Sequence, residues 1–226
     1  MQKSMEDAGV SYNACMPIPP YLTFGDLKKA AEKDKRIIPF TGVDFSNNHD
    51  ASSVLSGDVA AGAKGLKLHP IIQAIRLTDK RALEAVKSFE PHKLPILVHC
   101  GITSYYLGEE KKKEKPEYGD IAYMKNLATA FPRVNFIAGH AGIMQVNEVI
   151  ELLSSCKNVS VDISFQAPSI IKRLLKAFGA ERVLYGSDWP WGSQITAIKT
   201  VKAACKGDKQ LEAKIYHENA KRLLRL

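Results

Sequence analysis

The sequence lacks the patterns that would place the chain in several common classes. Its four cysteines, Cys15, Cys100, Cys156 and Cys205, form no CxxC pair, which argues against a disulfide framework or a zinc ribbon. No run approaches the roughly 18 to 20 apolar residues that crossing a bilayer requires. The N-terminal residues show no basic segment followed by an apolar one, so we find no signal peptide and expect a cytoplasmic protein.

Motifs that bind nucleotides are also missing. No GxGxxG follows the first expected strand, and no GxxxxGK followed by Ser or Thr occurs. The formal net charge of +8 raises nucleic acid as a partner. However, the densest basic cluster, residues 111–115, has glutamates within and beside it, which is typical of a solvated loop. We therefore expect no nucleic-acid or membrane partner, and a small anionic substrate suits the basic balance.

What the sequence does contain is a repeated strand-and-helix unit, which we interpret as one α/β domain over residues 1–226. Strict alternation of strands and helices predicts a parallel sheet, and apolar runs such as Ile96-Leu97-Val98 fit strands covered on both faces. An eight-stranded TIM-like barrel and an open doubly wound sheet both fit this order. The expected strands are 10–15, 37–44, 64–69, 94–100, 134–140, 159–163 and 182–186. The expected helices are 2–8, 26–33, 51–61, 79–87, 121–130, 146–153, 170–178, 194–204 and 210–226.

Polar residues recur where these strands end. His69, His99 and His140 end three of them, and Asp188 follows the last. In a barrel these residues converge on one mouth, where imidazoles and a carboxylate make a candidate site for zinc, manganese or iron. Each also has a plain structural explanation, since Asp188 could cap a turn and His69 could face a loop.

Other polar and aromatic residues need the same weighing. If Leu66 and Leu68 face the helices, strand alternation points Lys67 into the barrel, where a lysine must be paired or functional unless it snorkels to the mouth. Trp189 and Trp191 either pack or wall a pocket. The long polar loop over 102–118 is a candidate lid. His49, His92 and His217 are expected to be ordinary polar residues.

Five stretches, taken together and in order, resemble the amidohydrolase-related proteins of the metal-dependent hydrolase superfamily, which include the aminocarboxymuconate-semialdehyde decarboxylases. They are GLKLHP at 65–70, LVHCG at 97–101, FIAGHAG at 136–142, VLYGSDWP at 183–190 and ENAKRL at 218–223. The resemblance implies a distorted eight-stranded barrel with one divalent metal, usually zinc. It assigns His99 as a metal ligand, His140 as the group that positions water or substrate, and Asp188 as metal ligand and base.

The sequence departs from the family pattern at one place. Family members open with a His-x-His on the first strand, whereas this sequence has no histidine before His49. We therefore expect an incomplete barrel with family strands 2–8, whose open seam favours homo-oligomers and whose metal could be absent. A shortened N-terminus is our preferred explanation; a natural variant with a weakened metal site and a partner subunit that fills the gap are the alternatives.

Three functions follow as hypotheses. The first is a metal-dependent hydrolase or non-oxidative decarboxylase that acts on a small, carboxylate-bearing molecule, with Lys67, His69, Arg76, Trp189 and Trp191 as candidate substrate-binding residues. The second is a metal-independent, lactonase-like hydrolase with Asp188 as base and Lys67 or Arg76 holding anionic groups. The third is a catalytically impaired barrel that serves as a binding or assembly module.

Overall fold

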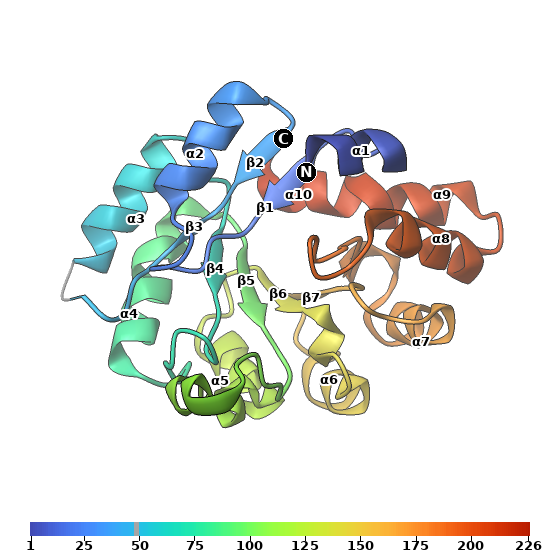
Figure 1. Ribbon diagram of the computed structural model, residues 1–226. Helices are drawn as coiled ribbons and strands as arrows, with labels where there is room; N and C mark the ends of the chain where they lie inside the picture. The colour runs from blue at the N-terminus through green and yellow to red at the C-terminus, as the bar shows by residue number, and fades with distance from the viewer. Residues whose placement is uncertain (48–49) are drawn as a thin grey trace.

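The strands of the computed structural model pair in parallel and follow one another in chain order (Figure 1). The structure describes residues 1–47 and 50–226. Each strand is short, and its neighbours in the wall are its neighbours in the chain. The strands are β1 Asn13–Cys15, β2 Ile37–Pro39, β3 Thr41–Gly42, β4 Leu66–Leu68, β5 Ile96–His99, β6 Phe136–Gly139, β7 Val159–Asp162 and β8 Val183–Leu184.

The expected strand over 37–44 is divided at Phe40. The Phe40 amide donates to the Cys15 carbonyl at 2.9 Å, whereas the next amide, that of Thr41, donates to the Gly65 carbonyl at 2.8 Å. The Lys64 amide also donates to the Pro39 carbonyl at 2.9 Å, so this segment bonds to β1 on one side and to the residues before β4 on the other. The two-residue strand β3 continues the line of β2, and the pairings group β1 with β2 and β3 with β4 to β8. No described pairing joins β8 to β1. The prediction of a TIM-like barrel that is incomplete is therefore confirmed.

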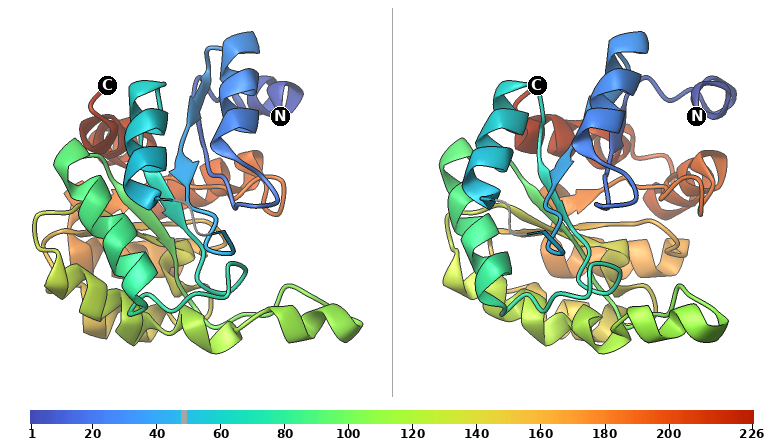
Figure 2. Two further views of the ribbon diagram at one scale, coloured as in Figure 1. Left: turned by 90° about the vertical axis from the view of Figure 1, so that its left-hand side faces the viewer. Right: turned by 60° about the vertical axis from the view of Figure 1, so that its left-hand side comes forward.

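Helices cover the outer face of this wall (Figures 1 and 2). They are α1 Gln2–Ala8, α2 Phe24–Lys33, α3 Ala51–Ala60, α4 Lys80–Phe89, α5 Ile121–Ala130, α6 Val146–Leu153, α7 Pro168–Phe178, α8 Gln194–Cys205, α9 Lys209–Ala213 and α10 Asn219–Leu224. Helix α2 begins before the expected residue 26 because Thr23 and Asp26 form a capping box. None of the described helices has the length and apolar composition that crossing a membrane requires.

Side chains alternate between two cores along each strand. Leu66, Leu68 and their counterparts point outward into the large core between the wall and the helices. A smaller cluster fills the inside of the barrel, where Leu97, Ile137 and Leu184 from three strands meet Leu223 and other residues of the C-terminal helix. Each buried aliphatic side chain contributes about 1.5–3 kcal/mol. This inner cluster separates the two ends of the barrel.

The outer edge of β8 is bonded to the C-terminal helix instead of to a strand. The Tyr185 amide donates to the Ile215 carbonyl at 2.8 Å, and the Asn219 side-chain amide donates to the Val183 carbonyl at 2.9 Å. A π-helical turn, Lys214–Glu218, includes Ile215 and interrupts the helix that the sequence predicted to be continuous over 210–226. The helix therefore protects an edge that would otherwise be open to another chain.

Candidate active site

The strand ends bring one buried polar group together at the carboxyl end of the barrel. Lys67 on β4 and His99 on β5 are only 5% and 1% exposed, and His69 and His140 follow β4 and β6 as buried residues. Asp162 at the end of β7 is also buried. Asp188, after β8, is partly buried, and its charge acts on Lys67. We call Lys67, His69, His99, His140, Asp162 and Asp188 the strand-end group.

The imidazoles lie in contact with one another. The rings of His69 and His99 stack with centroids 4.2 Å apart and planes 8° from parallel. The His140 ring lies 5.1 Å from that of His99. The Ile72 amide donates to Nδ1 of His69 at 3.3 Å, so the neutral His69 ring carries its hydrogen on Nε2. Burial lowers the pKa of all three histidines, which are therefore neutral near pH 7.

Tyr105, from the loop after β5, closes over His99. Its hydroxyl lies 3.1 Å from Nε2 and 3.3 Å from Nδ1 of His99. Glu114, itself buried, accepts from the Tyr105 amide at 2.7 Å and from the Ser104 hydroxyl, so one carboxylate holds this part of the loop together. Burial raises the pKa of the Tyr105 phenol, which stays protonated. The segment that contains the loop's 3₁₀ turn Gly108–Lys113 projects from the body (Figure 2).

A hydrogen-bonded relay fixes the orientation of His140. Its main-chain amide donates to Asp162 Oδ2 at 2.8 Å, and its Nδ1 lies 2.7 Å from the Ser164 hydroxyl. Because that hydroxyl donates its own hydrogen to Asp162, its oxygen accepts from Nδ1–H of His140. The neutral ring therefore presents Nε2 as a proton acceptor.

Lys67 is the positive charge of the strand-end group. Burial lowers its pKa from 10.5 to about 8, while Asp188 and Asp162 act in the opposite direction. The ammonium group is therefore largely charged at neutral pH but close to titration. A buried ammonium group near two carboxylates and neutral imidazoles can bind an anionic group of a substrate.

The backbone after the strands is strained. His140 has φ 57°, Phe165 has φ 63° and Asp188 has φ 52°, although none of them is glycine. These three residues follow β6, β7 and β8, so each strained residue stands at the same end of the barrel. Left-handed non-glycine residues cost about 1–3 kcal/mol each and concentrate at functional sites. The strain therefore supports a functional role for this end.

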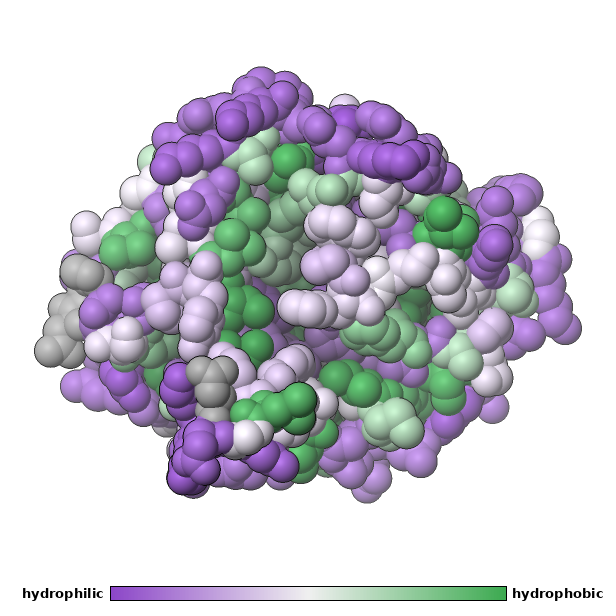
Figure 3. Space-filling model, in the orientation of Figure 1, coloured by the Kyte–Doolittle hydropathy of each residue, from purple (hydrophilic) through white to green (hydrophobic). Residues whose placement is uncertain are grey.

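Exposed aromatic residues surround the strand-end group. Trp189 is 39% and Phe165 53% exposed, and Tyr105 is 41% exposed. Trp191 is 80% exposed, so it stands out from the body and lines no buried wall. In the space-filling view, hydrophobic residues gather toward the middle of the face shown (Figure 3). Trp189, Phe165 and Tyr105 form an apolar rim around the strand-end group.

The remaining sequence candidates form no described contact with this group. Arg76 is exposed and lies over the Tyr118 ring at 5.0 Å, with no described hydrogen bond to the strand-end residues. His92 packs against Phe89 at 5.5 Å, and His217 is exposed. His49 lies outside the described residues.

The donor atoms do not fit a catalytic metal centre in this arrangement. Within residues 1–47 and 50–226, no three His, Cys, Asp or Glu side chains converge to hold a metal ion. His99, the expected ligand, has the Tyr105 hydroxyl against its ring nitrogens. Catalytic zinc usually takes about three protein ligands and a water. His99 and Asp188 alone are one ligand short of that number.

Sequence reasoning missed Asp162, Ser164 and Tyr105. Asp162 ends an apolar strand as His99 does, so the pattern used for the histidines could have found it. Ser164 and Tyr105 lie in loops, where no periodic pattern marks a side chain that turns inward. Their roles depend on tertiary contacts.

A family model described as amidohydrolase matches residues 26–226. The comparison with curated protein sequences gave no match.

Solved structures match the chain over its whole length. An uncharacterized TIM-barrel protein from Bordetella bronchiseptica has a TM-score of 0.79 at 16% identity, with 100% of this chain and 81% of that chain covered. A 5-carboxyvanillate decarboxylase from Novosphingobium aromaticivorans, complexed with manganese, has a TM-score of 0.76 at 16% identity, with 100% and 79% covered. A probable 2-pyrone-4,6-dicarboxylic acid hydrolase from Acinetobacter baumannii, with citric acid bound, has a TM-score of 0.67 at 14% identity, with 100% and 87% covered. At such identities these likenesses show the fold.

Proposed function

The chain is an enzyme of the amidohydrolase family, and we propose that it hydrolyses an ester or lactone bond in a small molecule that carries a carboxylate. The observation that carries the proposal is Lys67, a buried cation at the carboxyl end of the barrel between the charges of Asp188 and Asp162. A substrate carboxylate placed against this ammonium group gains a charge-assisted hydrogen bond out of water. The decarboxylase and the hydrolase of similar fold act, by their names, on carboxylate-bearing molecules.

Five residues of the strand-end group, all except His99, have a role in this reaction. Lys67 binds the substrate carboxylate, and the neutral His69 donates Nε2–H to the carbonyl oxygen. Asp188 takes a proton from water as the water oxygen attacks the carbonyl carbon. The carbon–oxygen bond of the ester then breaks, and the leaving oxygen takes the proton from Asp188. His140 accepts a hydrogen bond at Nε2 from the attacking water, and Ser164 and Asp162 keep its ring in the required tautomer.

Decarboxylation is a second candidate, favoured by the apolar rim of Trp189, Phe165 and Tyr105, which suits a planar aromatic acid. In that reaction the bond between a ring carbon and the carboxylate breaks, carbon dioxide leaves, and the ring carbon takes a proton from the acid form of Asp188. The products distinguish the two reactions, because only decarboxylation releases carbon dioxide.

A divalent ion, zinc by the family resemblance or manganese as in the decarboxylase of similar fold, has only His99 and Asp188 as expected protein ligands here. Because this donor set does not fit, the roles above include no metal. Elemental analysis of the purified protein tests the point directly. A stoichiometric metal that survives dialysis would contradict the metal-free account.

The decisive experiment compares two substrates with and without a chelator. Opening of 2-pyrone-4,6-dicarboxylate is followed by proton release, and 5-carboxyvanillate is followed by carbon dioxide release. We expect lactone opening that a chelator leaves unchanged and that Asp188→Asn abolishes, whereas Asp7→Asn, at an exposed carboxylate, retains it. Activity that appears only after manganese or zinc is added would overturn the metal-free reaction. Activity on neutral esters but on neither carboxylate would overturn the role of Lys67.

A further inference from the structure

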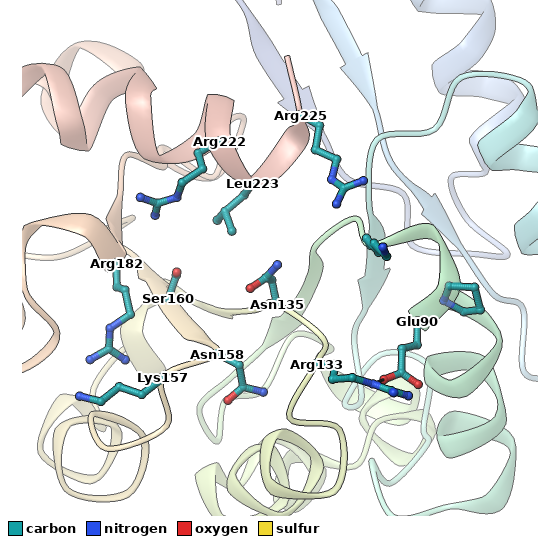
Figure 4. Close-up of a pocket in the computed structure, with 12 residues that line it drawn as sticks. Glu90, Arg133, Asn135, Lys157, Asn158, Ser160, Arg182, Arg222, Leu223 and Arg225 are labelled. Carbon is teal, nitrogen blue, oxygen red and sulfur yellow. Dashed lines mark hydrogen bonds and ion pairs between the residues drawn. The ribbon is translucent and has the colours of Figure 1, made fainter.

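A second concave region lies at the opposite end of the barrel from the strand-end group. It is a cavity of about 740 Å³ (Figure 4). Its walls are the segments that precede β5, β6, β7 and β8, together with the end of α10. Its lining residues are Glu90, Pro91, Lys93, Arg133, Asn135, Lys157, Asn158, Ser160, Arg182, Arg222, Leu223 and Arg225. We call this cavity the basic basin.

The charges of the basic basin are strongly unbalanced. Six of its lining side chains are cationic and one, Glu90, is acidic. Glu90 is paired with Arg133 at 2.9 Å, so its charge is already compensated. Arg222 is shared with Glu181, outside the lining, at 3.3 Å. The basin therefore keeps a net positive charge after its own ion pairs are formed.

Arg182 has a structural role that accounts for its position. It donates to the carbonyls of Phe178 at 2.9 Å and Ser154 at 2.9 Å, which belong to the ends of α7 and α6. It also donates to the carbonyls of Cys156 and Val159. These neutral acceptors leave its positive charge uncompensated, and the basin wall holds that charge in place.

Lys93, Lys157 and Arg225 have no comparable explanation. In the part of the chain that the structure describes, none of them forms an ion pair or a side-chain hydrogen bond, yet all three line the same cavity. Figure 4 shows Arg222, Leu223 and Arg225 on one side of the cavity and Arg182 and Lys157 on another, with Asn135 and Ser160 between them. Like charges that share a concave wall repel one another, and a bound anion removes that repulsion.

We propose that the basic basin binds a small polyanion with at least two phosphate or carboxylate groups. Arg and Lys donors from several walls suit such groups. The volume falls within the ~300–1,000 Å³ that small-molecule sites occupy. The apolar layer of Leu97, Ile137 and Leu184 separates the basin from the strand-end group, so this site is distinct from the proposed reaction centre.

The test uses inorganic pyrophosphate as the probe, titrated calorimetrically into the full chain at low ionic strength. We expect saturable one-to-one binding by the parent. The double variant Lys157→Gln/Arg225→Gln should bind at least about tenfold more weakly, because it loses two hydrogen bonds from charged donors to the anion. The matched control is Lys172→Gln/Lys199→Gln, which removes the same charge from exposed positions outside the basin. It is expected to bind like the parent. Thermal melting of each variant verifies that it is folded.

Two further experiments determine the chemical class of the ligand and show whether its binding depends on the strand-end group. Citrate that binds as tightly as pyrophosphate indicates recognition of charge, whereas weaker citrate binding indicates a phosphate preference; both support a polyanion site. A short single-stranded oligonucleotide that binds far more tightly than either would overturn the small-molecule proposal. Absence of saturable pyrophosphate binding, or equal loss in both double variants, would also overturn it. Asp188→Asn is expected to retain pyrophosphate binding. Binding at the basic basin can therefore be judged even if the proposed reaction is wrong.

Discussion

The two ends of the barrel both carry positive charge, but they hold it in different ways. At the carboxyl end, Lys67 is 5% exposed and burial lowers its pKa to about 8. At the amino end, Lys93, Lys157 and Arg225 are exposed to solvent around the basic basin. The buried amine is therefore close to titration at neutral pH. The difference teaches that burial, more than the number of charges, sets the electrostatic character of each end.

Backbone strain divides the same two ends. Lys93 and Arg225, beside the basic basin, have φ 55° each, but both close helical turns, where left-handed residues are common. His140, Phe165 and Asp188 have similar angles within four residues of the ends of β6, β7 and β8, where they close no helix. Helix ends explain the left-handed residues at the amino end. They do not explain those at the carboxyl end, which therefore support a functional role there.

Asp188→Asn gives the largest effect that the comparison predicts. The amide cannot take a proton from water, so we expect kcat/KM for the active substrate to fall by at least about a thousandfold, a loss of the size seen when one group of a catalytic set is removed. Pyrophosphate binding at the basic basin stays unchanged. Steady-state kinetics and calorimetry on the same preparation measure both. A variant with near-parental kcat/KM contradicts the assignment of the base.

Lys67→Met ranks second, with an expected loss of about a hundredfold in kcat/KM because one charged hydrogen bond to substrate disappears. Lys35→Met, at an exposed lysine, is the matched control and keeps parental activity. In the parent, kcat/KM falls above about pH 8 because the Lys67 ammonium loses its proton there.

The stability contribution of Lys67 has the opposite sign. Its pKa is lower in the folded chain than the ordinary 10.5, so between about pH 8 and 10.5 the unfolded state binds more protons. The contribution of this group to the free energy of unfolding therefore rises with pH in that window, while activity falls. Urea unfolding at several pH values, compared between parent and Lys67→Met, separates the two trends. A difference in the free energy of unfolding between parent and Lys67→Met that stays constant from pH 8 to pH 10 would contradict the lowered pKa of Lys67.

Much of the wall was predictable from sequence because each strand is an apolar run that ends in a polar or small residue. Ile96–His99 and Phe136–Gly139 lie inside the expected ranges. The alternation rule also gives the inward direction of Lys67 once Leu66 and Leu68 face the helices. Periodicity is a local property, and these features depend on local pattern and burial.

The division at Phe40, the π-helical turn before Asn219 and the relay through Ser164 were not predictable in this way. Around Phe40 the segment bonds to two neighbours at once, because the Phe40 amide donates to the Cys15 carbonyl and the Thr41 amide to the Gly65 carbonyl. The π-helical turn contains Ile215, whose carbonyl pairs with Tyr185, a partner thirty residues earlier in the chain. Each feature arises because a backbone or side-chain group needs a hydrogen-bond partner that is distant in the chain. A single sequence does not show which distant groups meet.

Tyr105→Phe sharpens the contrast by testing a loop residue at the carboxyl end. The hydroxyl contacts the His99 ring, which stacks on the ring of His69, so its loss frees His99 to turn and disturbs the His69 donor. We expect kcat to fall by about tenfold with little change in KM. Tyr12→Phe, at a tyrosine that is 66% exposed, is the matched control. Nitrogen NMR of the histidine rings provides a second readout, since the His99 signals shift only if the contact exists in solution. An effect on KM alone would place Tyr105 against the substrate instead.

Lys157→Gln carries the smallest predicted effect and tests the other half of the comparison. Its side chain is exposed, has no described ion pair and lies among like charges, so its removal breaks no contact and slightly relieves repulsion. We expect the free energy of unfolding to change by less than about 0.5 kcal/mol in the absence of anions. With saturating pyrophosphate, the parent gains more stability than the variant, because a ligand stabilises the state that binds it more tightly. A large loss of stability without any anion would show that Lys157 supports the fold, and the amino end would then no longer contrast with the buried lysine at the other end.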